Sequence, residues 1–498
     1  MSSKGNGWLE GTVGGAIDNR VLILALTILF SAVGCYFLAN MSVDAVPDVS
    51  NVQVVITANG RGLAPQEVEQ YVTYPIEIAM QSLPRLLFQR SISKYNLGQV
   101  TTVFEDGTDI YWARQQVAER LKAAQEQIPA NMNVKMSLGP IATGLGEIFQ
   151  FEVRGPGYSL MDLRDILDWE IIPALKTVPG VDDVESMGGD VKEYQVRLLP
   201  EKLHGYRVMP GEVMKALEQN NGNAGGGYAI EHNDQIILRA EGLLKDTEDI
   251  GNVIIRRTPQ GTIRVKDLSD VTIGKTLEQS IVTRDGEGET TIGVVLLRKG
   301  ENSKVVVERV KKKINQIRNS LPPNVEINTF YDRSVLIGRT IDTVKDNLLH
   351  GAILVVVVLF LLLGDLRGGL IAAIAIPLSL LGAVSFLSLA KISGNLFSLG
   401  AIDFGILIDG SVVMVEHILS RLADAKGNGQ TKLTIVRNAA REVAAPVLFA
   451  VLIITVVYLP ILALPGVSGK TFQPMALTVV FGLLTALAIA LYLTPSLS

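Results

Sequence analysis

Three carboxylates interrupt an apolar stretch, SLGAIDFGILIDGSVVMVEHILSRL (residues 398–422), that is otherwise long and apolar enough to cross a membrane. They are Asp403, Asp409 and Glu416, and no Lys or Arg lies in the apolar part of the stretch. A charged side chain near the middle of a bilayer costs roughly 2.5–3.5 kcal/mol on insertion scales. A carboxylate held at that depth can take up and release protons, so we expect these acids to act as proton carriers.

Helical geometry decides how these acids can work together. Asp409 and Glu416 fall on one face, about 10 Å apart along the axis. Asp403 is about 9 Å from Asp409 along the axis but turned by roughly 120°, so the three form no straight row. Gly405 and Gly410 leave room for close helix contact beside the acids. The alternative interpretation is that Asp403 caps the outer end of the helix and Glu416 lies at its wet inner end.

The composition divides the chain into a membrane part and a soluble part. Of 498 residues, 48% are hydrophobic, but residues from about 40 to 335 have the pattern of an ordinary soluble protein. The formal net charge of −5 gives no reason to expect binding to nucleic acid. The single cysteine, Cys35, excludes an intrachain disulfide, and the four histidines lack the spacing of a metal site. No nucleophile–base pair or phosphate loop indicates an enzyme, and no cofactor is expected.

Six apolar stretches are long enough to be transmembrane helices. The loop over 420–442 carries five basic residues against two acidic ones, which predicts that it is cytoplasmic. The N-terminus is then also cytoplasmic, and the large domain lies outside, in the periplasm of a bacterium. The expected spans are 21–39, 341–363, 369–390, 396–419, 443–463 and 471–494.

The N-terminal residues 1–20 precede the first span. Trp8, Leu9, Val13 and Ile17 recur at helical spacing, which predicts a short amphipathic helix on the cytoplasmic surface of the membrane. Several glycines in the same segment weaken a helix and leave a flexible tail as the alternative.

The outer part alternates strands and helices in the order βαββαβ, which is a ferredoxin-like unit, and then repeats that order. The second unit is expected to contain a hairpin over 181–200 and to be interrupted by an insertion with a flexible stretch, NNGNAGGGYA. Inserted loops on a rigid scaffold often contact neighbours, so we expect a docking role. The expected boundaries are 40–145 for the first unit, 146–204 and 276–335 for the second, and 205–275 for the insertion. The predicted fold class is therefore an α+β membrane protein with six transmembrane helices.

This layout resembles the N-terminal half of a resistance–nodulation–division (RND) efflux pump of the heavy-metal branch. In the fourth expected span, acids at Asp403, Asp409 and Glu416 are similar to the pattern of the cobalt–zinc–cadmium type. The other segments that carry the resemblance are VDAVPDVSNVQVVITANGRGLAPQEVEQYVTYPIEIAMQSLP, FEDGTDIYWARQQVAERL, GEIFQF and FYDRSVLIGRTIDTVKDNLLHGAILVVVVLFLLLGDLRGGL.

The resemblance implies a secondary transporter, a proton/cation antiporter of the bacterial inner membrane that exports divalent cations of the zinc, cobalt and cadmium class. It implies Asp403, Asp409 and Glu416 as the proton relay. It also implies a trimer embedded in membrane lipid, with two partners: a periplasmic adaptor and an outer-membrane channel.

Three alternatives remain open at this point. Copper or silver export is one, although the family's membrane methionine ladder is represented here by Met414, with Leu407 at another ladder position. A six-span accessory subunit of protein export is the second. The third is a truncated, non-transporting half, because the family's chain continues through a second outer domain and six more spans. The missing half would hold the basic partner of the relay and much of the metal cleft, so no metal ligands are assigned. His417 stands where the family usually has Asn.

Overall fold

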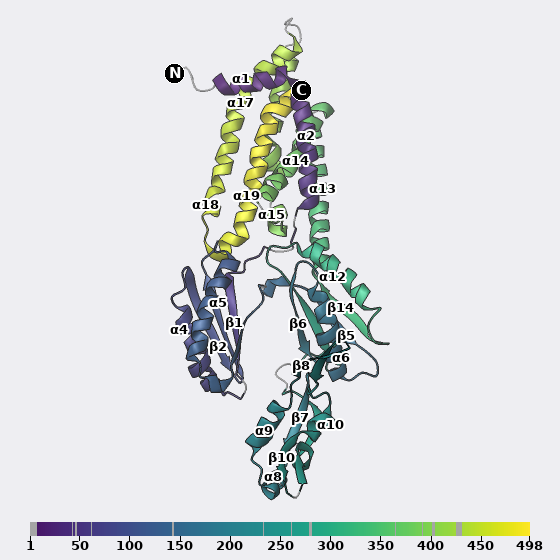
Figure 1. Ribbon diagram of the computed structural model, residues 1–498. Helices are drawn as coiled ribbons and strands as arrows, with labels where there is room; N and C mark the ends of the chain where they lie inside the picture. Colours follow the sequence, from purple (N-terminus) through teal and green to yellow (C-terminus); the bar gives the residue numbers. More distant parts are fainter. Residues whose placement is uncertain are drawn as a thin grey trace.

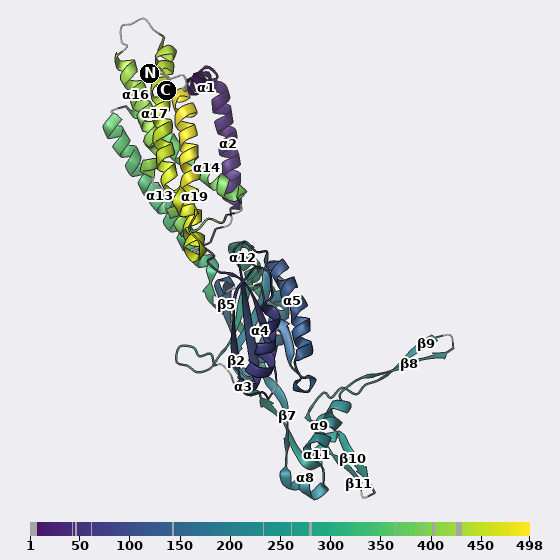
Figure 2. The same cartoon turned by 90° about the vertical axis from the view of Figure 1, so that its left-hand side faces the viewer.

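The computed structural model describes residues 7–41, 43–44, 47–60, 62–141, 144–232, 234–259, 261–277, 281–363, 365–390, 392–400, 404–424 and 431–498. Figure 1 shows a helical bundle, where both termini lie, joined at its other end to a mixed α/β region. Figure 2 shows that one hairpin projects far from this second region.

The bundle contains four helices, among the described residues, that are long and apolar enough to cross a membrane: Arg20–Asn40, Arg367–Leu389, Lys432–Leu462 and Gly466–Leu497. The expected spans 341–363 and 396–419 fall in other helices of the same bundle, so the count of six stays a prediction. The bundle elements are α1 (Gly7–Asp18), α2 (Arg20–Asn40), α13 (Arg333–Leu363), α14 (Leu366–Leu389), α15 (Leu396–Gly400), α16 (Phe404–Asp424), α17 (Lys432–Val457), α18 (Leu459–Leu462), α19 (Gly466–Ala488), η5 (Ile489–Leu493) and α20 (Thr494–Leu497).

Helices α14, α16, α17 and α19 share the core of the bundle. Small residues bring them close together: a Cβ added at Gly382 would lie 2.3 Å from the Thr485 Oγ1 atom, so α14 and α19 touch there. The N-terminal α1 covers the end of this core with Leu9, Val13 and Ile17, whereas Trp8 is exposed. The helix predicted in this segment is therefore present, and the flexible-tail alternative is wrong for residues 7–18.

The first α/β unit has a sheet in the order β2-β3-β1-β4 with every neighbouring pair antiparallel. Alternate residues of its central strand, among them Val54 and Ile56, are buried against Ile76, Met80 and Val117 of the helices. Its elements are β1 (Val52–Asn59), α3 (Pro65–Val68), η1 (Glu69–Thr73), α4 (Tyr74–Met80), β2 (Leu86–Lys94), β3 (Leu97–Phe104), α5 (Ile110–Gln127), η2 (Ala130–Met132) and β4 (Lys135–Leu138).

The second unit has an antiparallel sheet in the order β14-β5-β13-β6. Numbered by their order within each unit, the strands of both sheets run 2-3-1-4, so the two units are structural repeats. Its elements are η3 (Gly144–Gly146), β5 (Glu147–Arg154), α6 (Leu160–Ile166), η4 (Leu167–Ile171), α7 (Ile172–Lys176), β6 (Val181–Gly188), β13 (Thr291–Leu297), α12 (Ser303–Ile317) and β14 (Glu326–Asp332).

The hairpin expected over 181–200 is wrong: β6 pairs with β13 and not with the strand that follows it in the chain. Strand β7 (Lys192–Leu198) leaves the second unit and pairs with β12 (Ser269–Lys275) in a separate two-stranded sheet. These paired strands form the base of the inserted block, which therefore begins before the boundary expected at 204. The block has its own small core, which includes Leu203, Val213 and Leu268.

Within the inserted block, the stretch expected to be flexible forms a strand from Ala224 onward. Strand β8 (Ala224–Glu231) pairs with β9 (Asp234–Ala240), and this is the projecting hairpin of Figure 2. The other elements of the block are α8 (Pro200–Tyr206), α9 (Pro210–Gln219), α10 (Thr247–Asn252), β10 (Ile254–Thr258), β11 (Gly261–Arg264) and α11 (Val265–Leu268).

Candidate functional site in helix α16

Helix α16 has two sharply different faces. A stripe that includes Leu407, Ser411, Met414 and Ile418 is buried in the bundle core. Both acids, Asp409 and Glu416, are exposed on the opposite face, together with Val413 and Ser420. This exposed set recurs at intervals of three and four residues, so it forms one continuous row along the helix. Among the described residues, the neighbouring helices therefore pack on the apolar face of α16, and Asp409 and Glu416 lie on its exposed face.

The third predicted acid, Asp403, lies outside the described residues. The structure therefore brings Asp409 and Glu416 to one face, and the arrangement of all three acids stays a prediction.

The buried face of α16 is held by close packing. A Cβ added at Gly410 would lie 3.1 Å from the Val447 Cγ1 atom and 3.3 Å from the Ala490 Cβ atom. The Thr494 hydroxyl donates a hydrogen bond to the Ser411 Oγ atom over 3.3 Å. The expectation that Gly410 permits close helix contact is confirmed, and its partners are α17 and η5.

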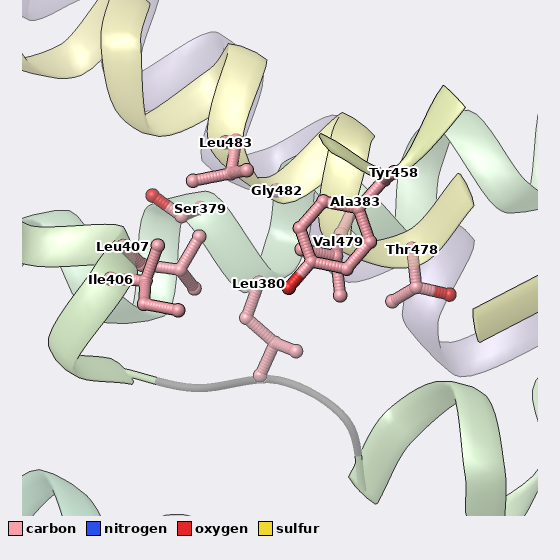
Figure 3. Close-up of a pocket in the computed structure, with 10 residues that line it drawn as sticks. All are labelled: Ser379, Leu380, Ala383, Ile406, Leu407, Tyr458, Thr478, Val479, Gly482 and Leu483. Carbon is pink, nitrogen blue, oxygen red and sulfur yellow. The ribbon is translucent and has the colours of Figure 1, made fainter. Parts of the chain in front are cut away.

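A small cavity lies between this buried face and helices α14 and α19, with Tyr458 at its edge (Figure 3). Its volume is about 10 Å³, which is close to the space of a single water molecule. Ser379 lines the cavity, and its buried hydroxyl has no hydrogen-bond partner within the described part of the chain. The packing on this side of α16 therefore leaves room for at most about one water.

Beyond Glu416, charged contacts tie α16 to α17. The Glu442 Oε2 atom accepts a hydrogen bond from Arg421 at 2.6 Å and lies 2.9 Å from the His417 Nε2 atom. The imidazole of His417 is thus directed to Glu442. Glu416 directly precedes His417 in the chain, and the choice between a relay role and a place at the inner end of the helix stays a prediction.

Helix α1 is fastened to α17 at the same end of the bundle. Arg437 forms an ion pair with Asp18, and the Arg441 Nε atom donates to the Glu10 carbonyl oxygen over 3.0 Å. Together with the buried apolar face of α1, these contacts fix the N-terminal helix against α17.

The first α/β unit is attached to the bundle through Lys470, near the start of α19. Its Nζ atom lies 2.6 Å from the Asp106 Oδ1 atom and donates to the Ser50 carbonyl oxygen at 3.1 Å and the Asn51 side chain at 3.3 Å. Charge-assisted hydrogen bonds of this kind are about twice as strong as neutral ones. The attachment therefore joins the first α/β unit to α19, a helix of the bundle that packs against α16.

The second unit is attached by chain continuity, because β14 ends at Asp332 and α13 begins at Arg333. The Lys311 Nζ atom of α12 lies 2.6 Å from the Asp332 Oδ2 atom. Burial alone would raise the pKa of Asp332, but hydrogen bonds from Lys311 and Ser334 outweigh it and hold the pKa below its ordinary value. The carboxylate is therefore ionised at neutral pH, and the ion pair braces the strand-to-helix junction.

Sequence reasoning missed Glu442 and Lys470 as structural partners. A weak signal was present for Glu442: His417 and Arg421 are four residues apart on one helix face, which favours a shared acidic partner. Lys470 stands immediately before an expected span, where a lysine is ordinary, so nothing local indicated its contacts. Among the described residues, no group of three or more His, Cys, Asp and Glu side chains could hold a metal ion.

An apolar helical bundle with acids on one of its helices, joined to two repeated α/β units, defines a membrane transporter rather than an enzyme. Residues 13–498 match the AcrB/AcrD/AcrF family, and the chain belongs to this family, in the heavy-metal efflux branch of the RND transporters.

Two bacterial relatives illustrate the similarity. The chain is 43% identical to the cation efflux system protein CzcA of Alcaligenes sp. strain CT14, over 98% of this chain and 47% of the relative. It is 42% identical to protein HelA of Legionella pneumophila over the same shares. A crystal structure of a heavy metal efflux pump is 33% identical with a TM-score of 0.88, covering 98% of this chain and 48% of that one. The chain thus spans about half the length of the relatives it matches.

Proposed function

We propose that this chain forms half of a proton-driven efflux pump for divalent heavy-metal cations in the bacterial inner membrane. The observation that carries the proposal is the position of Asp409 and Glu416 on one exposed face of α16, in a chain that belongs to the heavy-metal branch. In a full-length pump, a second bundle covers that face and supplies a basic partner to the acids. In this proposal the chain contributes six spans and supplies Asp403, Asp409 and Glu416 as the proton relay.

Protons drive the cycle through the charge of these acids. Each proton that moves inward releases about 2.3 kcal/mol per 100 mV of membrane potential. Protonation of Asp409 removes its charge and changes the contacts of α16 with the second bundle that covers its acidic face. The packing of α16 on α19 and the junction of α13 with β14 carry the movement to the two outer units, which open and close a metal cleft.

The cargo we favour is the zinc, cobalt and cadmium class. The chain is 42% identical to the cobalt-zinc-cadmium resistance protein CzcA of Cupriavidus metallidurans, against 36% to the nickel and cobalt resistance protein CnrA of the same organism. Copper and silver are the second candidate, because Met414 stands at one position of the methionine ladder of copper and silver pumps. The proposed partners are two further copies in a trimer, a periplasmic adaptor and an outer-membrane channel, and the β8–β9 hairpin is the proposed docking arm toward a neighbouring copy.

The test is metal efflux from cells that express this chain together with a second half. Export of zinc, cobalt or cadmium supports the proposal, and export of only copper or silver supports the second candidate. If no metal is exported although both halves are inserted and assembled, the chain is a non-transporting half. In the same assay, Asp403→Ala is expected to reduce export less than loss of Asp409, and no reduction would favour a capping role for Asp403.

The Lys470 attachment leads to a separate prediction. Lys470→Met removes the charged contacts to the first unit and is expected to lower the stability of that attachment by about 2 kcal/mol, the range for hydrogen bonds to charged groups. Asp106→Asn removes only the ion pair and leaves the contacts of Lys470 with Ser50 and Asn51, so it is expected to cost less, and the double variant is expected to be little worse than Lys470→Met alone. Thermal unfolding of the four proteins of this cycle, with Lys470→Arg as the control that retains the charge, measures the coupling. Strictly additive effects would show that the two residues do not act together.

A further inference from the structure

A groove of about 560 Å³ lies at the outer end of α2, between that helix end, α12 and the first turns of α13. We call it the α2–α12 groove. Figure 1 shows α12 beside the start of α13, close to the end of α2. The residues that line the groove include Leu38, Val305 and Ile341 on its apolar side and Lys304, Glu308 and Lys312 on its charged side.

The groove lies at the expected height of the membrane surface. Leu38 and Ala39 belong to the last turn of α2, a helix apolar enough to cross a membrane. Ile341 is the first residue of the span expected in α13. The outer end of one membrane helix and the outer end of another therefore form one wall, and α12 of the second unit forms the other.

One side of the groove is apolar and accessible. Leu38 is 48% exposed, and Val305 on the facing helix is 43% exposed. Apolar side chains at this height are favourable only when hydrocarbon covers them. An acyl chain that runs along α2 would supply that cover.

The other side of the groove is basic. Its lining holds three basic residues, Lys304, Arg309 and Lys312, against one acid, Glu308. Arg309 donates to the Pro179 carbonyl oxygen at 3.1 Å, and the Glu308 carboxylate lies 3.2 Å from the Lys311 ammonium, which it shares with Asp332. Lys304 and Lys312 are exposed, and within the described part of the chain neither makes a hydrogen bond or ion pair. They lie about 12 Å apart along α12, so both ammonium groups can reach one anionic headgroup above the apolar wall.

We propose that the α2–α12 groove binds one phospholipid with an anionic headgroup. The phosphate contacts the ammonium groups of Lys304 and Lys312, and the acyl chains lie against Leu38, Val305 and Ile341. A basic rim beside an apolar floor at the membrane surface fits a lipid, whereas free phosphate would gain nothing from the floor. Each basic residue near an anionic lipid surface strengthens binding roughly fivefold. Removal of both charges is therefore expected to weaken binding by about 25-fold.

Native mass spectrometry of the full-length purified chain tests the proposal, with added phosphatidylglycerol or phosphatidylcholine as the probe. We expect one tightly retained phosphatidylglycerol and no equally retained phosphatidylcholine. The double variant Lys304→Gln/Lys312→Gln is expected to lose this lipid. Lys313→Gln is the matched control, because Lys313 lies on the same helix with the same charge but does not line the groove, and it is expected to keep the lipid.

Three results would overturn the proposal. One is equal retention of phosphatidylglycerol by the double variant and the original chain. Another is equal retention of phosphatidylcholine, which would mean nonspecific lipid around the bundle. The last is displacement of phosphatidylglycerol by millimolar inorganic phosphate, which would make phosphate alone the ligand. Circular dichroism of each variant excludes misfolding as the cause of lipid loss.

Discussion

Replacement of Asp409 by asparagine is expected to reduce metal efflux by roughly 100-fold or more, the contribution typical of an acid–base group. Asparagine has nearly the same shape but cannot take up or release a proton. The side chain is on the exposed face of α16, so the substitution leaves the packing of Leu407, Met414 and Ile418 unchanged. Insertion and folding are therefore expected to be normal. Efflux of radioactive zinc from cells that also contain the second half measures the effect.

The control for this substitution is Asp424→Asn. Asp424 is an exposed carboxylate at the last residue of the same helix, beyond the apolar part. It is expected to leave efflux unchanged. Normal efflux by the Asp409→Asn protein would eliminate Asp409 as a proton carrier, and equal loss in both variants would point to general damage to the helix.

Loss of Glu152 is expected to have the largest effect on the stability of the second unit. This carboxylate is only 3% exposed, and it pairs with the Arg284 Nη1 atom at 2.6 Å and the Arg154 Nε atom at 2.9 Å. It also accepts a hydrogen bond from the Thr290 hydroxyl at 2.6 Å. Glu152→Ala leaves both guanidinium groups without this partner. Disruption of a fully buried pair costs about 3–5 kcal/mol.

The expected loss here is smaller, about 2 kcal/mol, because water reaches the remaining charges. Both arginine side chains are 38% exposed. Thermal unfolding of the purified chain is expected to show a transition lowered by roughly 4–8 °C. Glu287→Ala is the matched control, since Glu287 also pairs with Arg154, at 3.0 Å, but is 69% exposed. If the two variants unfold at the same temperature, burial of Glu152 contributes nothing to stability.

The local elements of this chain could be predicted from its sequence because their signals are local. Strand β1 alternates buried and half-buried residues from Val52 onward, and that period identifies a strand before any partner is known. Helix α5 begins where the Asp109 side chain accepts from the Trp112 backbone amide, and such a cap is readable in the sequence.

Pairing over long distances in the sequence could not be predicted in the same way. Strands β6 and β7 are separated by three residues and have strand-like composition, so a hairpin was the simplest interpretation. The partner of β7 is instead β12, and β6 pairs with β13, more than a hundred residues later. The register of such pairs depends on packing in the whole unit, which no local pattern contains.

The same difference between local signals and long-range contacts decides which residues of the candidate site could be predicted. Asp409 and Glu416 stand out because a charge in an apolar helix is costly wherever the helix packs. Glu442 and Lys470 stand near the ends of apolar stretches, where charges are common. Their importance lies in partners on other elements, such as His417 and Asp106, which only the folded chain brings to them.

Because β14 and α13 join directly, a rotation of one element is passed to the other. Helix α13 has 31 residues and is therefore about 46 Å long. With no linker to absorb rotation, a tilt of about 5° about its outer end displaces its inner end by about 4 Å. Conversely, a displacement of a few ångströms deep in the bilayer reaches the second α/β unit as a small rotation of its whole sheet. A flexible insertion between Asp332 and Arg333 would remove this coupling. The helical bundle and the second α/β unit would both stay folded but would move independently.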